Sequence, residues 1–184
     1  MKKQEKIDLI QQGIDETALC RCYFVYDEDY YYYYPYAVNN TFLLGHEEDD
    51  FQLDGYCIRK LSHLKKVEIK DDKCNDINKF LGITDQLSDP GIDITSWKHI
   101  FESLSQLDTY IVIEDDFGEQ FAIGVIEKVL KDRLFFKSFD ADGIWEEGNW
   151  EIRYSQITSV SWGTRYDQGW KRYLEHPQAC GSQA

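Results

Sequence analysis

The chain has 184 residues, of which 42% are hydrophobic and 15% aromatic, a profile that excludes intrinsic disorder and predicts folded cores. Its 34 acidic residues exceed its 20 basic residues and give a formal net charge of -14, which disfavours binding to phosphate backbones and to anionic lipid. No run approaches the ~20 apolar residues that a membrane span needs, and the first residues carry no apolar signal-peptide core, so we expect a soluble cytoplasmic protein.

The first half of the chain is typical of a helix followed by five short strands. Ile7, Ile10 and Ile14 recur at three- and four-residue spacing and predict an amphipathic helix over residues 3–14. Alternating strand formers and turn signals then predict the following strands, and a closing helix after them: 18–26, 30–34, 41–45, 56–60, 65–70 and the helix 72–81.

Between the third and fourth of these strands the sequence is strongly acidic. Residues 47–50 are all acidic and predict a solvated loop. Asp54-Gly55 follows and is the strongest short hairpin signal in this half, because both residue types tolerate the left-handed backbone of a tight turn. We therefore expect the hairpin to turn at Asp54-Gly55.

The second half repeats this order of elements. Thr95 or Ser96 caps a helix that runs through Leu104. Residues 165–175 are expected to close the half. Five strands are predicted between these helical segments: 109–114, 120–130, 134–139, 150–154 and 158–162.

A short internal repeat supports this duplication. Residues 148–162 align with residues 55–69 when one single-residue gap is allowed. Because both halves must fill the same places, we expect the aligned apolar residues to be core positions. They are Ile152, Ile157, Val160 and Trp162, over Ile58, Leu64, Val67 and Ile69.

The spacing of the two copies predicts two modules. Residues 83–95 hold the only Pro-Gly pair and no clear period, which indicates a linker. The modules are then 1–82 and 96–176, with a tail over 177–184.

The order of elements resembles the Sm-like and SH3-like group of small barrels, in which a helix precedes a bent five-stranded sheet. The resemblance covers most of both modules and implies a mainly β protein of two tandem small five-stranded antiparallel barrels, each with a leading α-helix. The basic-glycine pair by which Sm proteins contact RNA is not carried over, because Lys60 follows Arg59 and Tyr154 follows Arg153. Two such small modules bury little surface each, so packing against each other or a homo-oligomer is expected.

A run of tyrosines in the first module is the most unusual local feature. On a strand, Tyr31 and Tyr33 lie on the opposite face from Tyr30, Tyr32 and Tyr34. If one set packs inward, the other exposes rigid amphipathic rings of the kind that binding surfaces favour, and cross-strand packing within a barrel is the alternative. We assign the following residues to a partner-binding surface: Tyr31, Tyr33, Glu47, Glu48, Asp49, Asp50, Asp140, Asp142, Glu146 and Glu147.

Two metal sites are weighed against simpler interpretations. Cys20 and Cys22 face one side of a predicted strand and, with Cys57, Cys74, His46 or His63, contain the donors of a zinc site. The second module has no matching ligands, and an odd total of five cysteines without a signal peptide indicates reduced, buried thiols.

The second metal candidate is the acidic loop of the second module. Residues 140–143, followed by Glu146 and Glu147, are similar to the start of a calcium loop. The spacing of an EF-hand is not met, so a solvated hairpin loop is preferred and no metal or other cofactor is expected.

Motifs of catalysis are absent from the sequence. It contains no Gly-x-Ser-x-Gly, no phosphate-binding glycine loop and no Cys-His pair that recurs in both modules, which indicates that the chain is not an enzyme. The main basic cluster, Arg153, Arg165, Lys171 and Arg172, is interleaved with aromatic residues.

The sequence therefore favours a non-catalytic acidic binding protein that docks a basic protein partner. An immunity or inhibitor protein that guards against a cationic toxin or nuclease is one form of this function, because charge complementarity accelerates capture. The alternatives are an Sm-like nucleic-acid-binding module that uses the basic cluster, and a metal-dependent enzyme with zinc or calcium.

Overall fold

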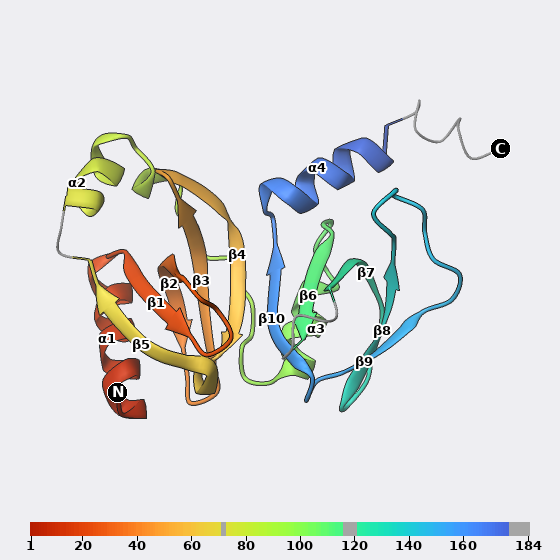
Figure 1. Cartoon of the computed structure of the whole chain (residues 1–184), viewed down its shortest axis with the longest axis horizontal. Helices are drawn as coiled ribbons and strands as arrows, with labels where there is room; N and C mark the ends of the chain where they lie inside the picture. Colours follow the sequence, from red (N-terminus) through yellow and green to blue (C-terminus); the bar gives the residue numbers. More distant parts are fainter. Residues whose placement is uncertain (71–72, 116–120, 177–184) are drawn as a thin grey trace. The chain divides into compact units, whose positions relative to one another are not determined.

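A computed structural model describes residues 1–70, 73–115 and 121–176. The contacts within the chain divide it into two units, Met1–Ser96 and Trp97–Ala184. The described residues form ten strands and four α-helices (Figure 1).

Unit 1 follows the predicted order of helix, five strands and helix. A single turn of 3-10 helix, Leu61–His63, links its last two strands. The strands lie in the order β5-β1-β2-β3-β4, and their pairs are antiparallel. The elements are α1 (Lys3–Glu16), β1 (Cys20–Phe24), β2 (Tyr30–Val38), β3 (Phe42–Asp49), β4 (Gln52–Lys60), β5 (Leu64–Ile69) and α2 (Lys73–Phe80).

Unit 2 repeats that order. Its strands lie in the equivalent order β10-β6-β7-β8-β9, again with antiparallel pairs, so the repetition of elements that the sequence predicts is confirmed. The elements are α3 (Trp97–Leu104), β6 (Ile111–Asp115), β7 (Phe121–Val129), β8 (Arg133–Ser138), β9 (Trp150–Arg153), β10 (Ile157–Trp162) and α4 (Arg165–Leu174).

The ten strands belong to one open sheet, with the order β5-β1-β2-β3-β4-β10-β6-β7-β8-β9. The expectation of two separate five-stranded barrels is therefore wrong, whereas the mainly β class is confirmed. Closing five strands into a barrel requires the two end strands to pair. In the order formed by the described strands, β5 is not a neighbour of β4, and β9 is not a neighbour of β10.

The core of unit 1 lies between α1 and one face of the sheet. Ile10 of α1 is fully buried in it, with Ile7 and Ile14 packed alongside. Gly13 allows this close approach, because a Cβ atom there would lie 2.5 Å from Cys20 Sγ and 3.1 Å from Pro35 Cγ. The buried cluster consists of Ile10, Cys20, Cys22, Phe24, Tyr33, Leu43, Cys57, Leu61, Leu64 and Val67.

Unit 2 has its own core and a capped last helix. Phe101 of α3 is fully buried and stacks on Tyr154, with ring centroids 5.6 Å apart. Thr164 and Asp167 form a capping box at the start of α4, and Asp167 is itself buried. The first contact joins α3 to the end of β9, and the capping box fixes the start of α4 after β10.

The core positions predicted from the internal repeat are confirmed. The four residues of the second copy are buried, and so are three of the first copy, while Ile69 is partly buried against the same cluster. The repeat therefore records a shared packing requirement.

The hairpin between β3 and β4 turns at a different place from the predicted one. The two turn residues are Asp50 and Phe51, with φ of 48° and 63°, as a type I′ turn requires. Gly55 instead has φ 76° inside β4, at a bulge where the register shifts between His46 and Glu48. The prediction of a turn at Asp54-Gly55 is wrong. A β-bulge and a tight turn both need a left-handed backbone, so the glycine signal does not distinguish them.

Candidate functional site

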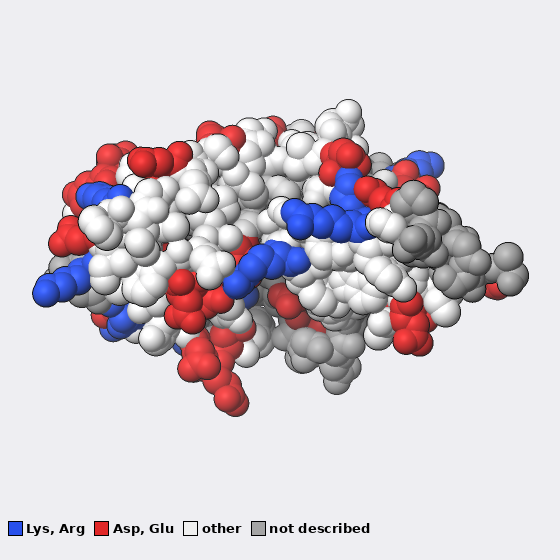
Figure 2. Space-filling view, turned by 90° about the horizontal axis from the view of Figure 1, so that it is seen from above, with Lys and Arg blue, Asp and Glu red and all other residues white. Residues whose placement is uncertain are grey.

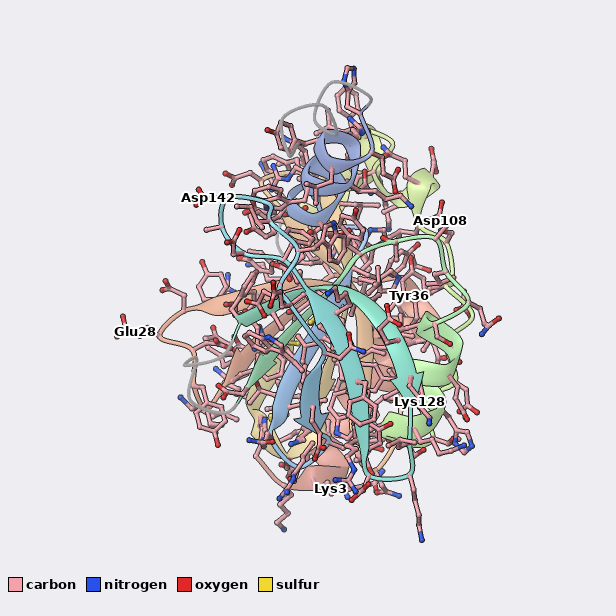
Figure 3. The ribbon with its side chains drawn as sticks, turned by 90° about the vertical axis from the view of Figure 1, so that its right-hand side faces the viewer. Lys3, Glu28, Tyr36, Asp108, Lys128 and Asp142 are labelled. Carbon is pink, nitrogen blue, oxygen red and sulfur yellow. The ribbon has the colours of Figure 1, made fainter. Side chains whose placement is uncertain are left out.

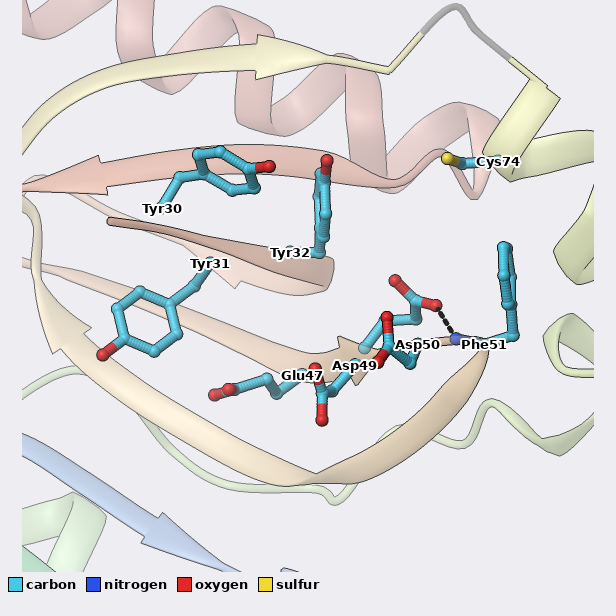
Figure 4. A pocket seen from close by; sticks show the side chains of 9 residues that line it. Tyr30, Tyr31, Tyr32, Glu47, Asp49, Asp50, Phe51 and Cys74 are labelled. Atoms are coloured by element: carbon cyan, nitrogen blue, oxygen red, sulfur yellow. Dashed lines mark hydrogen bonds between the residues drawn. The ribbon is translucent and has the colours of Figure 1, made fainter. Parts of the chain in front are cut away.

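A surface cavity of about 370 Å³ lies in unit 1, beside the β3–β4 hairpin (Figure 4). It contains both groups that the sequence singled out in this half, the tyrosine run and the acidic residues. The lining residues come from β2, β3, the hairpin turn and α2, and they are Tyr30, Tyr31, Tyr32, Glu47, Glu48, Asp49, Asp50, Phe51 and Cys74. Five of the residues assigned to partner binding thus border one cavity.

Strand pairing decides which side chains share a face at this cavity. Tyr32 pairs with Glu48, and Tyr33 pairs with Glu47, across β2 and β3. Paired residues point to the same face and neighbours in a strand to opposite faces. Glu48 therefore shares its face with Tyr32, whereas Glu47 shares the other face with Tyr33.

The tyrosines of β2 divide in the same way. Tyr33 is 2% exposed in the core, and Tyr31 packs against it with ring centroids 6.1 Å apart. Tyr30 is 43% exposed, on the face that also carries Tyr32. Tyr30 is thus exposed and Tyr31 and Tyr32 are partly buried, whereas Tyr33 and, on the opposite face, Tyr34 are enclosed.

Glu48 is an acidic residue that the fold buries. It is 6% exposed, and its Oε1 accepts a hydrogen bond of 2.7 Å from the backbone N–H of Phe51 (Figure 4). Burial raises the pKa of Glu48 above its usual range, and hydrogen bonds from the Phe51 backbone and the Asn78 side chain oppose that shift. Within the described residues, Glu48 makes no ion pair with a lysine or arginine.

Glu47 shares the core face with Tyr33 and is partly buried. Burial raises the pKa of Glu47 to about 7, although the Arg59 charge and the nearby Tyr33 hydroxyl act in the opposite direction. Asp54 and Asp49 add smaller upward effects. Glu47 is therefore a carboxyl that titrates near neutral pH.

Two arginines contact the tyrosine rings of β2, one on each face of the sheet. The guanidinium of Arg59 lies 4.5 Å from the ring centroids of both Phe24 and Tyr31 and 2.6 Å from an Asp27 oxygen. The guanidinium of Arg21 lies 4.6 Å from the centroid of Tyr30.

Sequence reasoning missed both arginines as part of this site. The alternation of side chains along paired strands could have indicated Arg21, because Arg21 pairs directly with Tyr32 across β1 and β2. An Arg21 nitrogen also donates a hydrogen bond of 2.9 Å to the Tyr32 hydroxyl. The face that carries Tyr30 and Tyr32 therefore has a cation on its β1 side.

The residues considered for zinc do not form a metal site within the described residues. Cys20, Cys22 and Cys57 lie in the unit 1 core, and burial raises the pKa of Cys20 to about 12, which disfavours the thiolate that binds zinc. His46 stacks on Tyr56 with centroids 4.2 Å apart, and burial lowers the pKa of His46 to about 4. Across residues 1–70, 73–115 and 121–176, no three His, Cys, Asp or Glu side chains are arranged to hold a metal ion.

The acidic loop between β8 and β9 in unit 2 is organised by its own contacts. Asp140 Oδ1 accepts hydrogen bonds of 2.9 Å from the backbone N–H groups of Asp142 and Ile144. A carboxylate oxygen of Glu146 accepts a hydrogen bond from the indole N–H of Trp150. Asp142 projects outward from this loop, as Glu28 does from the β1–β2 loop of unit 1 (Figure 3).

The basic cluster considered for nucleic acid lies on β9 and α4. Lys171 forms ion pairs with Asp108 and, at 3.6 Å, with Glu175. Arg153 approaches Glu151 at 4.0 Å. The face shown in Figure 2 carries both Lys and Arg side chains and Asp and Glu side chains.

The described helices include none that is long and apolar enough to span a membrane. Comparisons of the chain with protein-family models, with curated proteins and with solved structures each give no match, so its own residues carry the functional argument.

Proposed function

We propose that this chain is a non-catalytic binding protein that docks a basic protein partner through the cavity of unit 1. The single observation that supports this function most is the lining of that cavity, in which tyrosine rings lie beside Glu47, Glu48, Asp49 and Asp50. Carboxylates attract the cationic side chains of a partner, and tyrosines supply rigid contact area at low entropic cost.

The charge of the whole chain supports the same function. A formal net charge of -14 produces a negative field that steers a cationic protein toward the surface and raises the association rate. In the basic cluster, Arg153 and Lys171 lie beside carboxylates, which leaves the alternative of nucleic-acid binding with less support.

An inhibitor or immunity protein is the form of this function that binding alone fulfils. Such a protein needs only to cover the active surface of a cationic toxin or nuclease. Fast, electrostatically steered capture suits that role, because the target must be neutralised before it acts.

The test combines capture with a defined binding measurement. Proteins of the native host that bind the immobilised chain are identified, produced in pure form, and their association rates measured at low and high ionic strength. The variant Asp49→Asn/Asp50→Asn is expected to associate more slowly, by about threefold to tenfold, because rim charges act mainly on the association rate.

The matched control is Asp142→Asn/Glu147→Gln, which removes two exposed carboxylates from unit 2. It should associate nearly as fast as the wild type if the cavity of unit 1 is the docking site. An unrelated basic protein serves as a second control for non-specific attraction. A partner whose binding is insensitive to both salt and the unit 1 variant would contradict the proposal.

A further inference from the structure

A row of three paired residues crosses the face of β1, β2 and β3 that lies opposite the unit 1 core. Arg21 pairs with Tyr32, and Tyr32 pairs with Glu48, so the three side chains share one face. Tyr32 therefore has a cation on its β1 side and a carboxylate on its β3 side. The cavity opens beside that carboxylate.

The carboxylate end of this row lacks a counter-charge. Glu48 is buried and makes no ion pair with the described lysines and arginines, although the cavity leaves room beside it. A buried carboxylate without a cation is unfavourable, and a cation that enters the cavity offsets this cost. The cavity beside Glu48 is therefore suited to a positively charged ligand.

We propose that the cavity holds one arginine side chain of the basic partner, with its guanidinium against Tyr32 and paired with Glu48. This inference rests on the proposed function and specifies the group that the partner inserts. Asp50 and Phe51 of the hairpin turn border the same cavity and extend the contact to its rim.

Arginine is favoured over lysine by the shape of its guanidinium, because both kinds of cation already lie over tyrosine rings of this unit, Lys70 Nζ among them at 5.7 Å from the Tyr32 centroid. Arg21 already lies over the rings of Tyr30 and Tyr32, at 4.6 and 5.4 Å, and Arg59 lies over Tyr31 at 4.5 Å. A planar guanidinium stacks on an aromatic ring and reaches a carboxylate with two N–H groups, whereas an ammonium acts as a point charge.

The test uses short glycine-flanked peptides that differ in one side chain: arginine, lysine, or citrulline, which is the uncharged isostere of arginine. Binding to the full chain is followed by ¹H–¹⁵N NMR. The arginine peptide is expected to shift the amides of Tyr32, Glu48 and Phe51, and the citrulline peptide to bind about tenfold more weakly.

The variant Glu48→Gln is expected to weaken arginine-peptide binding by about tenfold, while Glu127→Gln, at an exposed position of β7 in unit 2, leaves it unchanged. Glutamine retains the acceptor for the Phe51 N–H, so the hairpin is preserved. Should Glu48→Gln fail to fold, the comparison of arginine and citrulline peptides on the wild type still decides. Equal binding of these two peptides, equal binding of the lysine peptide, or shifts confined to other residues would overturn the inference.

The outcome is separable from that of the proposed function. If a basic partner binds but the arginine peptide does not, the partner docks without an arginine in this cavity, and only the inference fails. If the peptide binds at Glu48 but no basic partner exists, the cavity is a guanidinium site and the proposed function fails.

Discussion

The acidic β3–β4 hairpin of unit 1 and the acidic β8–β9 loop of unit 2 look alike in sequence and differ in how their carboxylates are used. In unit 2, Asp140 accepts two backbone N–H bonds within its own loop. In unit 1, Glu48 is buried beside a cavity and accepts hydrogen bonds from the Phe51 backbone and the Asn78 side chain, but among the described residues it has no counter-charge. An acidic stretch thus indicates a binding surface only where the fold leaves its charge uncompensated.

The largest expected effect comes from the aligned arginines of the two units. Arg59 has a side chain 13% exposed, packs between two rings and pairs with Asp27, whereas Arg153 is 66% exposed. Arg59→Met is expected to lower the free energy of unfolding by about 3 kcal/mol, because it leaves Asp27 without its partner. Arg153→Met should change it by less than about 0.5 kcal/mol. Urea denaturation measures both, and equal losses would remove the distinction between the units.

The second expected effect is dependent on pH and concerns Glu47. Its pKa is about 7 in the fold, above the ordinary value of 4.5, so folding favours the protonated form. The stability that this proton provides is complete below about pH 4.5 and is lost as the pH rises through about 7. Glu47→Gln should therefore stabilise the protein by about 1–3 kcal/mol at about pH 8 and have little effect at about pH 4.

The control for this prediction is Glu147→Gln in the exposed loop of unit 2. It should leave the dependence of the unfolding free energy on pH unchanged. Thermal or urea unfolding across the pH range provides the measurement. A Glu47→Gln variant that follows the wild type at every pH would show that Glu47 titrates as an exposed carboxyl.

Much of the fold could be predicted from sequence because it depends on local pattern. The order of elements and the core positions, such as Ile58 and Ile152, follow from hydrophobic spacing that each unit must satisfy. Whether the five strands of each unit close into a barrel or stay in an open sheet could not be predicted. Pairing between end strands depends on twist and on the partners available at each edge, and not on side-chain pattern.

For the site, the sequence predicts which side chains share a face of a strand, but not which face is buried. Alternation separates Tyr31 from Tyr32, but only the packing of α1 decides that the Tyr31 and Tyr33 face is the inner one. The role of Glu48 was hidden, because its burial depends on the hairpin turning at Phe51 rather than at the stronger local signal of Gly55.

A third, smaller effect is expected within the unit 2 loop. Asp140→Ala removes the acceptor of two backbone N–H bonds and should lower the free energy of unfolding by about 1 kcal/mol. Asp142→Ala, in the same loop, removes an exposed carboxylate and should change it by less than about 0.5 kcal/mol. Equal effects of the two substitutions on urea denaturation would mean that the loop is not held by Asp140.

The smallest expected effect concerns Phe51, at the turn of the unit 1 hairpin. A residue with a Cβ is strained at φ 63°, and Phe51→Gly removes that strain, so the free energy of unfolding should rise by about 0.5 kcal/mol. The backbone N–H that binds Glu48 is kept, while the aromatic wall of the cavity is lost. A variant that is at least as stable as the wild type and binds the arginine peptide several-fold more weakly would show that Phe51 is held in a strained turn for its ring. If arginine-peptide binding were unchanged, the cavity would function through Tyr32 and Glu48 alone.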